Sequence, residues 1–299
     1  MAKEKIPVYD ICSLSKDKNR QSDFLIERFG DYLKRHHQDL HQPHRHSFYH
    51  LVLFTKGAGT HSIDFNKFRV TPFQAYFMIP GQVHSWHFEK ETDGYIINFS
   101  DNFFRSFLLN QNYFDRFQFF SGISEDCVCQ LSPAIQKKAI QLFEEMITQS
   151  AIDGKETATD ITRLLLLQFF LLVDKHHTNK TKKAVPPQKL VLLKNFRKLI
   201  DQNYRSVKLP REYADLLYIT PNHLNALCQD LLGKTAGELI RDRVLLEAKR
   251  LLTNANMSIT EIAFDLDFQD NSYFNRFFKK NTGMTPDEFR KKFITQQAK

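Results

Sequence analysis

Two neighbouring stretches near the C-terminus decide the fold: SITEIAFDLDF, residues 258–268, and NSYFNRFFKK, residues 271–280. The first opens with a capping box, because Ser258 and Glu261 are spaced to satisfy free N–H groups of a first helical turn. Apolar residues of both stretches recur at the spacing of one helix face: Ile259, Ile262, Ala263, Leu266, Phe274, Phe277 and Phe278. The pattern predicts two helices joined by a tight turn at Phe268, a helix-turn-helix unit over about residues 259–281.

The same arrangement occurs about fifty residues earlier, over residues 209–232. Ala214 and Ala263 each lie five positions before the apolar residue of the turn. Leu224 follows Ala214 by ten positions, whereas Phe274 follows Ala263 by eleven, so the second turn must hold one extra residue. In the earlier unit, the side chains expected to face inward are Ala214, Leu216, Leu217, Ile219, Leu224, Leu227, Cys228 and Leu231.

Helix starts are dense in this part of the chain, and no strand pattern follows Pro187. Thr220 precedes a proline, and capping boxes begin at Thr235 and Thr285 as well as at Ser258. Residues 235–252 have the apolar spacing of one long helix, which would fix the separation of the two units. An all-α C-terminal domain is therefore predicted.

The second helix of each unit has a polar outward face. In the first unit this face holds Asn222, His223, Asn225, Ala226 and Gln229, and in the second it holds Ser272, Tyr273, Asn275, Arg276, Lys279 and Lys280. Amide, imidazole and guanidinium groups can hydrogen-bond to base edges in the major groove of DNA. The two faces together predict a double-stranded DNA partner.

The net charge of +8 is unevenly distributed. Residues 178–299 hold 22 Lys and Arg against 13 Asp and Glu, a balance of +9, while residues 1–177 hold 20 against 21, a balance of −1. The basic excess of the C-terminal part favours a polyanionic partner. Acidic residues mixed through this part disfavour a protein that packages DNA without regard to sequence.

Four longer motifs make the chain resemble the AraC/XylS-type transcription regulators. They are IRDRVLLEAKRLL (240–252), SITEIA (258–263), SYFNRFFKK (272–280) and TGMTPDEFR (282–290). The resemblance covers about residues 190–292 and implies seven helices, with the second helix of each unit in adjacent major-groove segments of one DNA face. Two turn positions that are usually glycine in the family are Tyr218 and Asp267 here.

The resemblance also implies roles for individual residues. Base readout is expected from Asn222, His223, Asn225, Gln229, Ser272, Tyr273 and Arg276, with Asn275 on the same face. Lys279, Lys280 and Arg205 are expected to contact phosphates, which set affinity rather than sequence. RNA polymerase is a further partner expected of a promoter-bound regulator.

The rest of the chain predicts a second domain, which makes the protein an α+β multidomain chain. The polar, basic segment TNKTKKAVPP, residues 178–187, ends in two prolines and is typical of a linker. We therefore expect an N-terminal domain over residues 1–177, a linker over 178–189 and the DNA-binding domain over 190–299.

Within the N-terminal domain, residues 50–99 consist of short β-rich runs separated by turn residues, which predict an antiparallel barrel or jelly roll. A helix is expected to start at Ser132-Pro133, and a second over residues 156–177. The second is apolar around most of its girth, so it must be covered on several sides. Either its own domain buries it, or a second copy of the chain packs on it to form a homodimer.

Two histidine motifs of this domain resemble those of cupins. PHRH (43–46) with His50, and IPGQVH (79–84), place His44, His46, His50 and His84 at cupin positions, with His50 where metal-binding cupins have glutamate. We interpret the four histidines as an effector-binding site without a metal or other cofactor, as is usual for cupins fused to this DNA-binding domain. The alternative is a nitrogen-rich zinc, iron or nickel site in a metal-dependent cupin enzyme with an accessory DNA-binding tail.

Several function classes are not expected. No apolar run is long enough to span a membrane, and the first residues lack the pattern of a secretory signal, so we expect a cytoplasmic protein. Four scattered cysteines, Cys12, Cys127, Cys129 and Cys228, predict free thiols rather than a disulfide framework. No catalytic triad or phosphate-binding motif is present, so the chain is expected not to be an enzyme.

Overall fold

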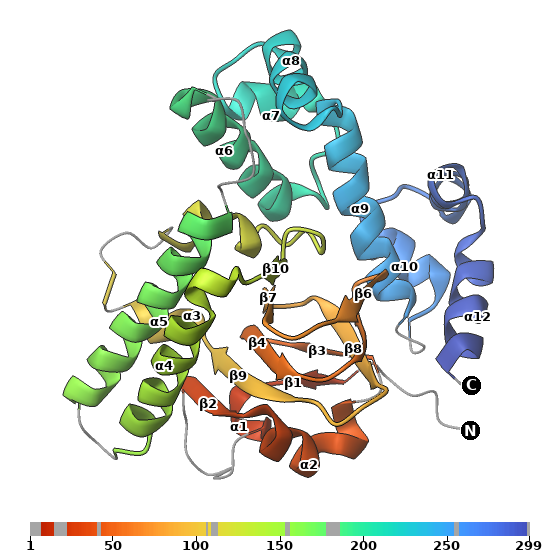
Figure 1. The fold of residues 1–299 in the computed structure, drawn as a ribbon. Coiled ribbons are helices and arrows are strands. Elements are labelled where there is room, and N and C mark those ends of the chain that lie inside the picture. Colours follow the sequence, from red (N-terminus) through yellow and green to blue (C-terminus); the bar gives the residue numbers. More distant parts are fainter. Residues whose placement is uncertain are drawn as a thin grey trace. The chain divides into compact units, whose positions relative to one another are not determined.

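A computed structural model describes residues 7–14, 23–40, 43–105, 107–108, 113–152, 156–177, 186–253 and 257–297. The chain divides into two compact units, one spanning residues 7–182 and the other residues 183–299 (Figure 1). Residues 178–185 of the expected linker lie outside the described residues. The first helix after this linker begins at Pro187, three residues before the expected start of the second domain.

Two five-stranded sheets form the first unit. One sheet has the order β1 (Val8–Tyr9), β3 (His44–His46), β8 (Val83–Phe88), β5 (Gly59–Ile63) and β6 (Asn66–Val70). The other has the order β10 (Val128–Gln130), β7 (Gln74–Met78), β4 (Tyr49–Lys56), β9 (Asp93–Phe99) and β2 (Phe24–Arg28). Neighbours are antiparallel except for the parallel pair β1 and β3. The β-rich runs of residues 50–99 are confirmed as strands β4 to β9.

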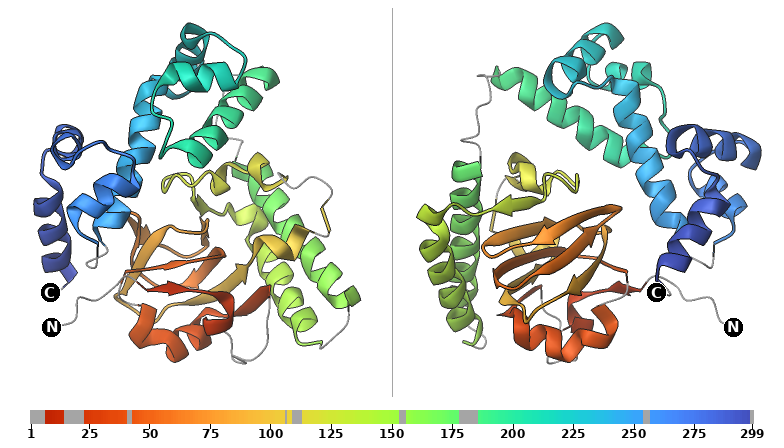
Figure 2. Two further views of the ribbon diagram at one scale, coloured as in Figure 1. Left: turned by 180° about the vertical axis from the view of Figure 1, so that it is seen from behind. Right: turned by 45° about the vertical axis from the view of Figure 1, so that its right-hand side comes forward.

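The central strands of the second sheet, β7, β4 and β9, are buried on both faces, which explains why they are mostly apolar rather than alternating. In β9, Tyr95 and Phe99 contact Phe143 and Phe170, with ring centroids 4.9 and 6.0 Å apart. These two partners lie on helices α4 (Pro133–Ser150) and α5 (Glu156–His177), which run side by side along one side of the strands (Figure 2). The intervening Asn98 faces the interior between the sheets, because side chains alternate along a strand.

The remaining helical segments of this unit are short or peripheral. They are α1 (Ile11–Leu14), α2 (Phe29–Leu40), α3 (Asp101–Arg105) and the 3₁₀ turns η1 (Tyr113–Arg116) and η2 (Gln118–Phe120). The expected helix starts at Ser132-Pro133 and Glu156 are both confirmed, although the Ser132 hydroxyl makes no capping hydrogen bond. All four cysteines are free thiols, as expected.

The second unit is helical. Its described residues form α6 (Pro187–Asn203), α7 (Pro210–Leu216), α8 (Pro221–Leu232), α9 (Ala236–Leu252), α10 (Ile259–Asp265), α11 (Asn271–Thr282) and α12 (Pro286–Gln297). These are the seven helices that the family resemblance implies. The two-domain α+β class, with a two-sheet β domain and a helical domain, is therefore confirmed.

Capping at the helix starts follows the sequence prediction. Thr235 and Glu238 exchange hydrogen bonds at the start of α9, with the Thr235 N–H donating to the carboxylate at 2.6 Å. Ser258 and Glu261 do the same before α10, and Thr285 and Glu288 before α12. Each box satisfies backbone donors that a first helical turn otherwise leaves free.

Among the helices in the described part of the chain, none combines the length and the hydropathy that crossing a membrane requires.

Candidate DNA-binding surface and buried histidine cluster

The two helix-turn-helix units have the same turn. Tyr218 and Asp267 take positive φ values of 56° and 57°. The next residue in each turn returns a hydrogen bond to the inward alanine, from Ile219 N–H to Ala214 O at 3.0 Å and from Phe268 N–H to Ala263 O at 2.9 Å. These are the positions that the family usually fills with glycine, and non-glycine residues adopt this conformation only at an energetic cost.

The extra residue of the second turn is Gln269. Thr220 follows Ile219 directly and caps α8, accepting a hydrogen bond from the His223 N–H at 3.2 Å. In the second unit Gln269 stands between the turn and its cap, Asp270, which accepts from the Tyr273 N–H at 2.6 Å. The insertion predicted from the sequence therefore lies between the turn and the second helix.

Buried apolar residues hold each second helix against its unit. Leu224, Leu227 and Cys228 are buried on α8, and Phe274 and Phe278 on α11. The expectation for Leu216 is wrong: its side chain is exposed, and Tyr213 occupies the core instead. The helical spacing fitted both residues, and Tyr213 is the one whose hydroxyl finds a partner, Val207 O, at 2.9 Å.

The outward faces carry most of the residues predicted to read DNA. The exposed ones are Asn222, His223 and Gln229 on α8 and Ser272, Tyr273, Arg276, Lys279 and Lys280 on α11. On α8 the exposed polar groups are neutral or acidic, whereas α11 exposes three cationic groups. Both helices thus offer hydrogen-bonding surfaces free of the core.

Two predicted contact residues are engaged within the protein. Asn225 is half-buried, and its carboxamide oxygen accepts from the Ala236 N–H at 3.0 Å, which joins α8 to the start of α9. Asn275 is also half-buried, and its amide donates to the backbone and side-chain oxygens of Asn271. The position equivalent to Ala236 is Pro286, which has no N–H to donate, so Asn275 cannot repeat the first contact.

Arg205, predicted to contact phosphate, is already paired. Its guanidinium lies 3.4 Å from the Asp265 carboxylate and donates to the Tyr204 hydroxyl. Nearby, Lys208 donates to Leu266 O at 2.8 Å, at the end of α10. Both cations connect the segment before α7 to α10 of the second helix-turn-helix unit. They therefore link the two helix-turn-helix units within the helical domain, a role that the sequence did not indicate for Lys208.

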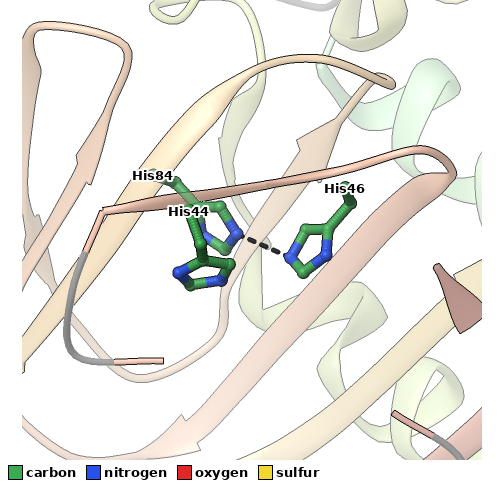
Figure 3. Close-up of side chains that lie close together, drawn as sticks. All are labelled: His44, His46 and His84. Atoms are coloured by element: carbon green, nitrogen blue, oxygen red, sulfur yellow. Dashed lines mark hydrogen bonds between the residues drawn. The ribbon is translucent and has the colours of Figure 1, made fainter. Parts of the chain in front are cut away.

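The four cupin-motif histidines lie together inside the N-terminal two-sheet domain. His44, His46, His50 and His84 are each at most 3% exposed, and His61, which the motifs do not include, is fully buried beside them. Strand register brings them together, because His44 pairs with His84 across β3 and β8, and His46 lies on the same face of β3 as His44. Figure 3 shows the rings of His44, His46 and His84 facing one another.

Hydrogen bonds link the imidazoles into a chain. His84 Nε2 lies 2.7 Å from His46 Nε2, and His84 Nδ1 lies 3.1 Å from His61 Nε2. His50 Nδ1 lies 2.6 Å from the carboxamide oxygen of Asn98 on the adjacent strand β9. The sequence motifs missed His61 and Asn98, because only strand pairing across the fold brings them to this site.

Burial keeps these rings uncharged. It lowers the pKa of His50 to about 3, and it lowers the pKa values of His46, His61 and His84 well below the ordinary value, with the neighbouring imidazoles adding to the effect. A neutral imidazole has a lone pair on one ring nitrogen, and it is the form of histidine that binds metals. The cluster is enclosed, rather than lying at an open barrel mouth.

Comparison with protein-family models gives two matches. The model described as "AraC-like ligand binding domain" matches residues 32–167, and the model described as "Helix-turn-helix domain" matches residues 213–292. The first match contains most of the two-sheet unit with the histidine cluster. The second contains both helix-turn-helix units except for the first residues of α7.

Curated relatives align along most of the chain. The transcriptional activator RhaR of Escherichia coli O139:H28 is 24% identical over 259 residues, which are 86% of this chain and 89% of RhaR. The regulator YijO of Escherichia coli K12 is 27% identical over 177 residues, 59% of this chain and 60% of YijO. Among solved structures, ToxT from Vibrio cholerae aligns with a TM-score of 0.44 at 13% identity, over 90% of this chain and 98% of ToxT.

A ligand-binding domain and a helix-turn-helix domain in one chain define a DNA-binding transcription regulator. The two units of the fold, the paired turns and the alignment with RhaR agree with this class. The chain belongs to the AraC family of transcription regulators.

Proposed function

We propose that this regulator reads a specific DNA sequence by placing α8 and α11 in neighbouring segments of the major groove. The observation that carries the proposal is the pair of turns with matching backbone geometry, each followed by a helix with an exposed polar face. Asn222, His223 and Gln229 on α8 would contact base edges, and so would Ser272, Tyr273 and Arg276 on α11. Lys279 and Lys280 would contact phosphates, which fix position without reading sequence.

The other predicted contacts have different roles in this proposal. Asn225 and Asn275 support the reading helices through their hydrogen bonds, and Arg205 supports the junction between the units. The other predicted contacts on α8 and α11 are exposed, and their side chains are available to contact the DNA. Their replacement should change DNA binding with little effect on folding, whereas replacing the bonded asparagines should affect both.

Selection of bound duplexes from a random-sequence DNA library tests the proposal. We expect an enriched motif with two segments separated by about one helical turn, roughly 10 base pairs. A protein that enriches no motif, or binds every duplex with equal affinity, would contradict it. The double variant Asn222→Ala, Arg276→Ala should bind random DNA but lose the preference for the selected motif.

The N-terminal two-sheet domain is proposed to control DNA binding through an effector held at the histidine cluster. An effector acts on an equilibrium only when it binds one arrangement of the protein more tightly than another. Residues 32–167 match a ligand-binding model, and the buried imidazoles form a cluster of polar groups inside that region.

The remaining proposals concern partners and location. Leu164 and Leu171, seven residues apart on one face of α5, are 55% and 38% exposed, and we propose that a second copy covers them in a homodimer. The variant Leu164→Lys, Leu171→Lys should then remain monomeric in light scattering at concentrations where the unmodified chain is dimeric. As a promoter-bound protein it would act in the cytoplasm and meet RNA polymerase.

A further inference from the structure

Two helices can read one duplex only if the domain holds them at a fixed separation and a fixed rotation. The helix α9 supplies the separation, because α7 and α8 pack near one of its ends and α10 packs near the other (Figure 1). The residues that α9 buries in the shared core include Ile240, Val244 and Leu251. Apolar attraction has no preferred direction, so polar contacts of defined geometry restrain the rotation of the two helix-turn-helix units more tightly.

Lys208 makes such a contact between the units. Its ammonium group donates to Leu266 O, at the C-terminal end of α10, at 2.8 Å, and it also donates to the backbone oxygen of Arg205. It lies 5.3 Å from the centroid of the ring of Phe268, the apolar residue of the second turn. The end of a helix and the face of an aromatic ring both attract a cation. A side chain from the segment before α7 therefore holds the turn of the second helix-turn-helix unit.

Each end of this contact is fixed to one helix-turn-helix unit. On one side Tyr213, which is buried on α7, donates from its hydroxyl to Val207 O at 2.9 Å, and Val207 directly precedes Lys208. On the other side the ring of Phe268 packs against Phe274 of α11, with centroids 5.2 Å apart. A continuous series of contacts therefore runs from α7 through Lys208 to α11.

An ion pair restrains the same junction. The Arg205 guanidinium lies 3.4 Å from the carboxylate of Asp265 on α10, and it donates to the Tyr204 hydroxyl at 3.2 Å. The Tyr204 ring is covered by Arg243 of α9, whose guanidinium lies 4.0 Å from the ring centroid. Arg205 and Lys208 thus contact α10 at two neighbouring residues, and two such contacts resist rotation better than one.

We propose that Lys208 is a positioning residue that fixes the spacing of the two DNA segments that the protein recognises. The inference rests on the proposed function, because it concerns how α8 and α11 share one duplex. One base pair inserted between the segments moves them about 3.4 Å further apart along the duplex and turns one relative to the other by roughly 35°. The domain cannot follow this rotation while the Lys208 contacts persist, so it discriminates against altered spacings.

Binding to duplexes of altered spacing tests the proposal. The selected motif is prepared at its own spacing and with one base pair added or removed, and fluorescence anisotropy measures each Kd. The unmodified chain should bind the altered duplexes at least about 10-fold more weakly, because one segment loses its base contacts. Lys208→Met keeps the apolar stem but loses the hydrogen bonds, and it should reduce this penalty to less than about 3-fold. An unchanged penalty in Lys208→Met would refute the proposal.

Matched variants separate positioning from other roles. Lys292→Met is the control, because it removes the same charge from an exposed position on α12 and should leave the spacing penalty unchanged. Asp265→Asn weakens the attraction to Arg205 and should lower the penalty to a smaller extent, and it decides the matter if Lys208→Met fails to fold. If Lys208→Met instead loses affinity equally for every duplex, with a salt slope shallower by about one, Lys208 contacts phosphate and the proposal is wrong.

A measurement without DNA separates this inference from the proposed function. Spin labels at Gln229→Cys in α8 and Lys280→Cys in α11 report the distance distribution between the two helices by double electron–electron resonance. The labelled chain also carries Cys12→Ser, since the other three cysteines are buried. Lys208→Met should broaden the distribution, and an equally narrow distribution would overturn the inference. A chain whose distribution broadens but which selects no DNA motif would support the restraint by Lys208 and refute the proposed function itself.

Discussion

The two helix-turn-helix units share a backbone but differ in the surface that they present. Their turns have φ values within one degree of each other, and both return the same hydrogen bond to a buried alanine. Their second helices correspond at an offset of fifty residues, so Ala226 is equivalent to Arg276 and Gln229 to Lys279. The packing positions are apolar in both units, although the residues differ, whereas the solvent-facing positions differ in charge.

This difference predicts a division of labour on DNA. From Pro221 to Leu232, α8 carries no lysine or arginine and has Asp230 on its exposed side, whereas α11 carries Arg276, Lys279 and Lys280. Attraction to phosphates is the main sequence-independent part of DNA affinity. The second unit should therefore supply most of the general affinity, and the first unit should contribute mainly to the choice of sequence.

The largest expected effect is on stability and comes from the core, where the second helices also differ in the size of an equivalent buried residue. Phe278→Ala should lower the free energy of unfolding of the helical domain by about 3–5 kcal/mol, because it leaves a cavity in a packed core. The equivalent Cys228→Ala removes much less volume and should cost about 1 kcal/mol. Urea unfolding followed by far-ultraviolet circular dichroism measures both.

The chain contains its own control for this experiment. Its single tryptophan, Trp86, lies in the β unit, so tryptophan fluorescence reports that unit. Phe278→Ala should shift the circular dichroism transition while the fluorescence transition stays in place. Movement of both transitions by the same amount would show that the two units unfold together, contrary to their separate cores.

The next effect concerns sequence reading by the second unit. Arg276→Ala should weaken binding to the selected motif by about 1–3 kcal/mol and change random-sequence binding less, because a bidentate contact to a base is lost. Fluorescence anisotropy with both duplexes measures the difference. If Arg276→Ala loses the same affinity on both duplexes, Arg276 contacts phosphate only. The reciprocal variant, Ala226→Arg, should raise the affinity for random DNA.

Lys279→Gln makes the second unit resemble the first at an equivalent position. The affinity should fall by a similar factor for every duplex, and the slope of log affinity against log salt should become shallower by about one, since one phosphate contact is removed. Salt titrations of the unmodified chain and the variant measure this slope. An unchanged slope would place Lys279 away from the DNA backbone.

The smallest effect concerns the shared turn. Glycine in place of Tyr218 removes the strain of a positive φ but increases the freedom of the unfolded chain, so we expect a net gain of less than about 1 kcal/mol. Asp267→Gly should gain less, because aspartate tolerates this conformation better than tyrosine. Thermal unfolding compares the two variants. Destabilisation by Tyr218→Gly would show that the tyrosine ring, although 96% exposed, stabilises the turn.

The helical domain could be predicted closely because its signals are local. Capping pairs such as Thr235 with Glu238 and the apolar spacing around Phe274 lie within one or two turns of helix. The error at Leu216 arose because Leu216 and Tyr213 fitted the same spacing. The intramolecular partners of Asn225 and Arg205 were also not predicted, because they lie on other helices.

The β unit could be predicted only in part, because its site depends on pairing between distant strands. The motifs identified four of the histidines, but His61 joins them through the pairing of β5 with β8, and Asn98 through the pairing of β4 with β9. Neither register follows from local sequence. The strand β2 and the helix α2 that follows it were also not predicted.

The most direct test of paired DNA reading by α8 and α11 is a methylation-interference experiment on the selected DNA motif, which probes the major-groove edge of guanines. We expect two sensitive segments on one face of the duplex, about 10 base pairs apart. Asn222→Ala with Gln229→Ala should abolish sensitivity in one segment, and Arg276→Ala in the other. A single sensitive segment, or two on opposite faces, would contradict the claim that both helices read one duplex.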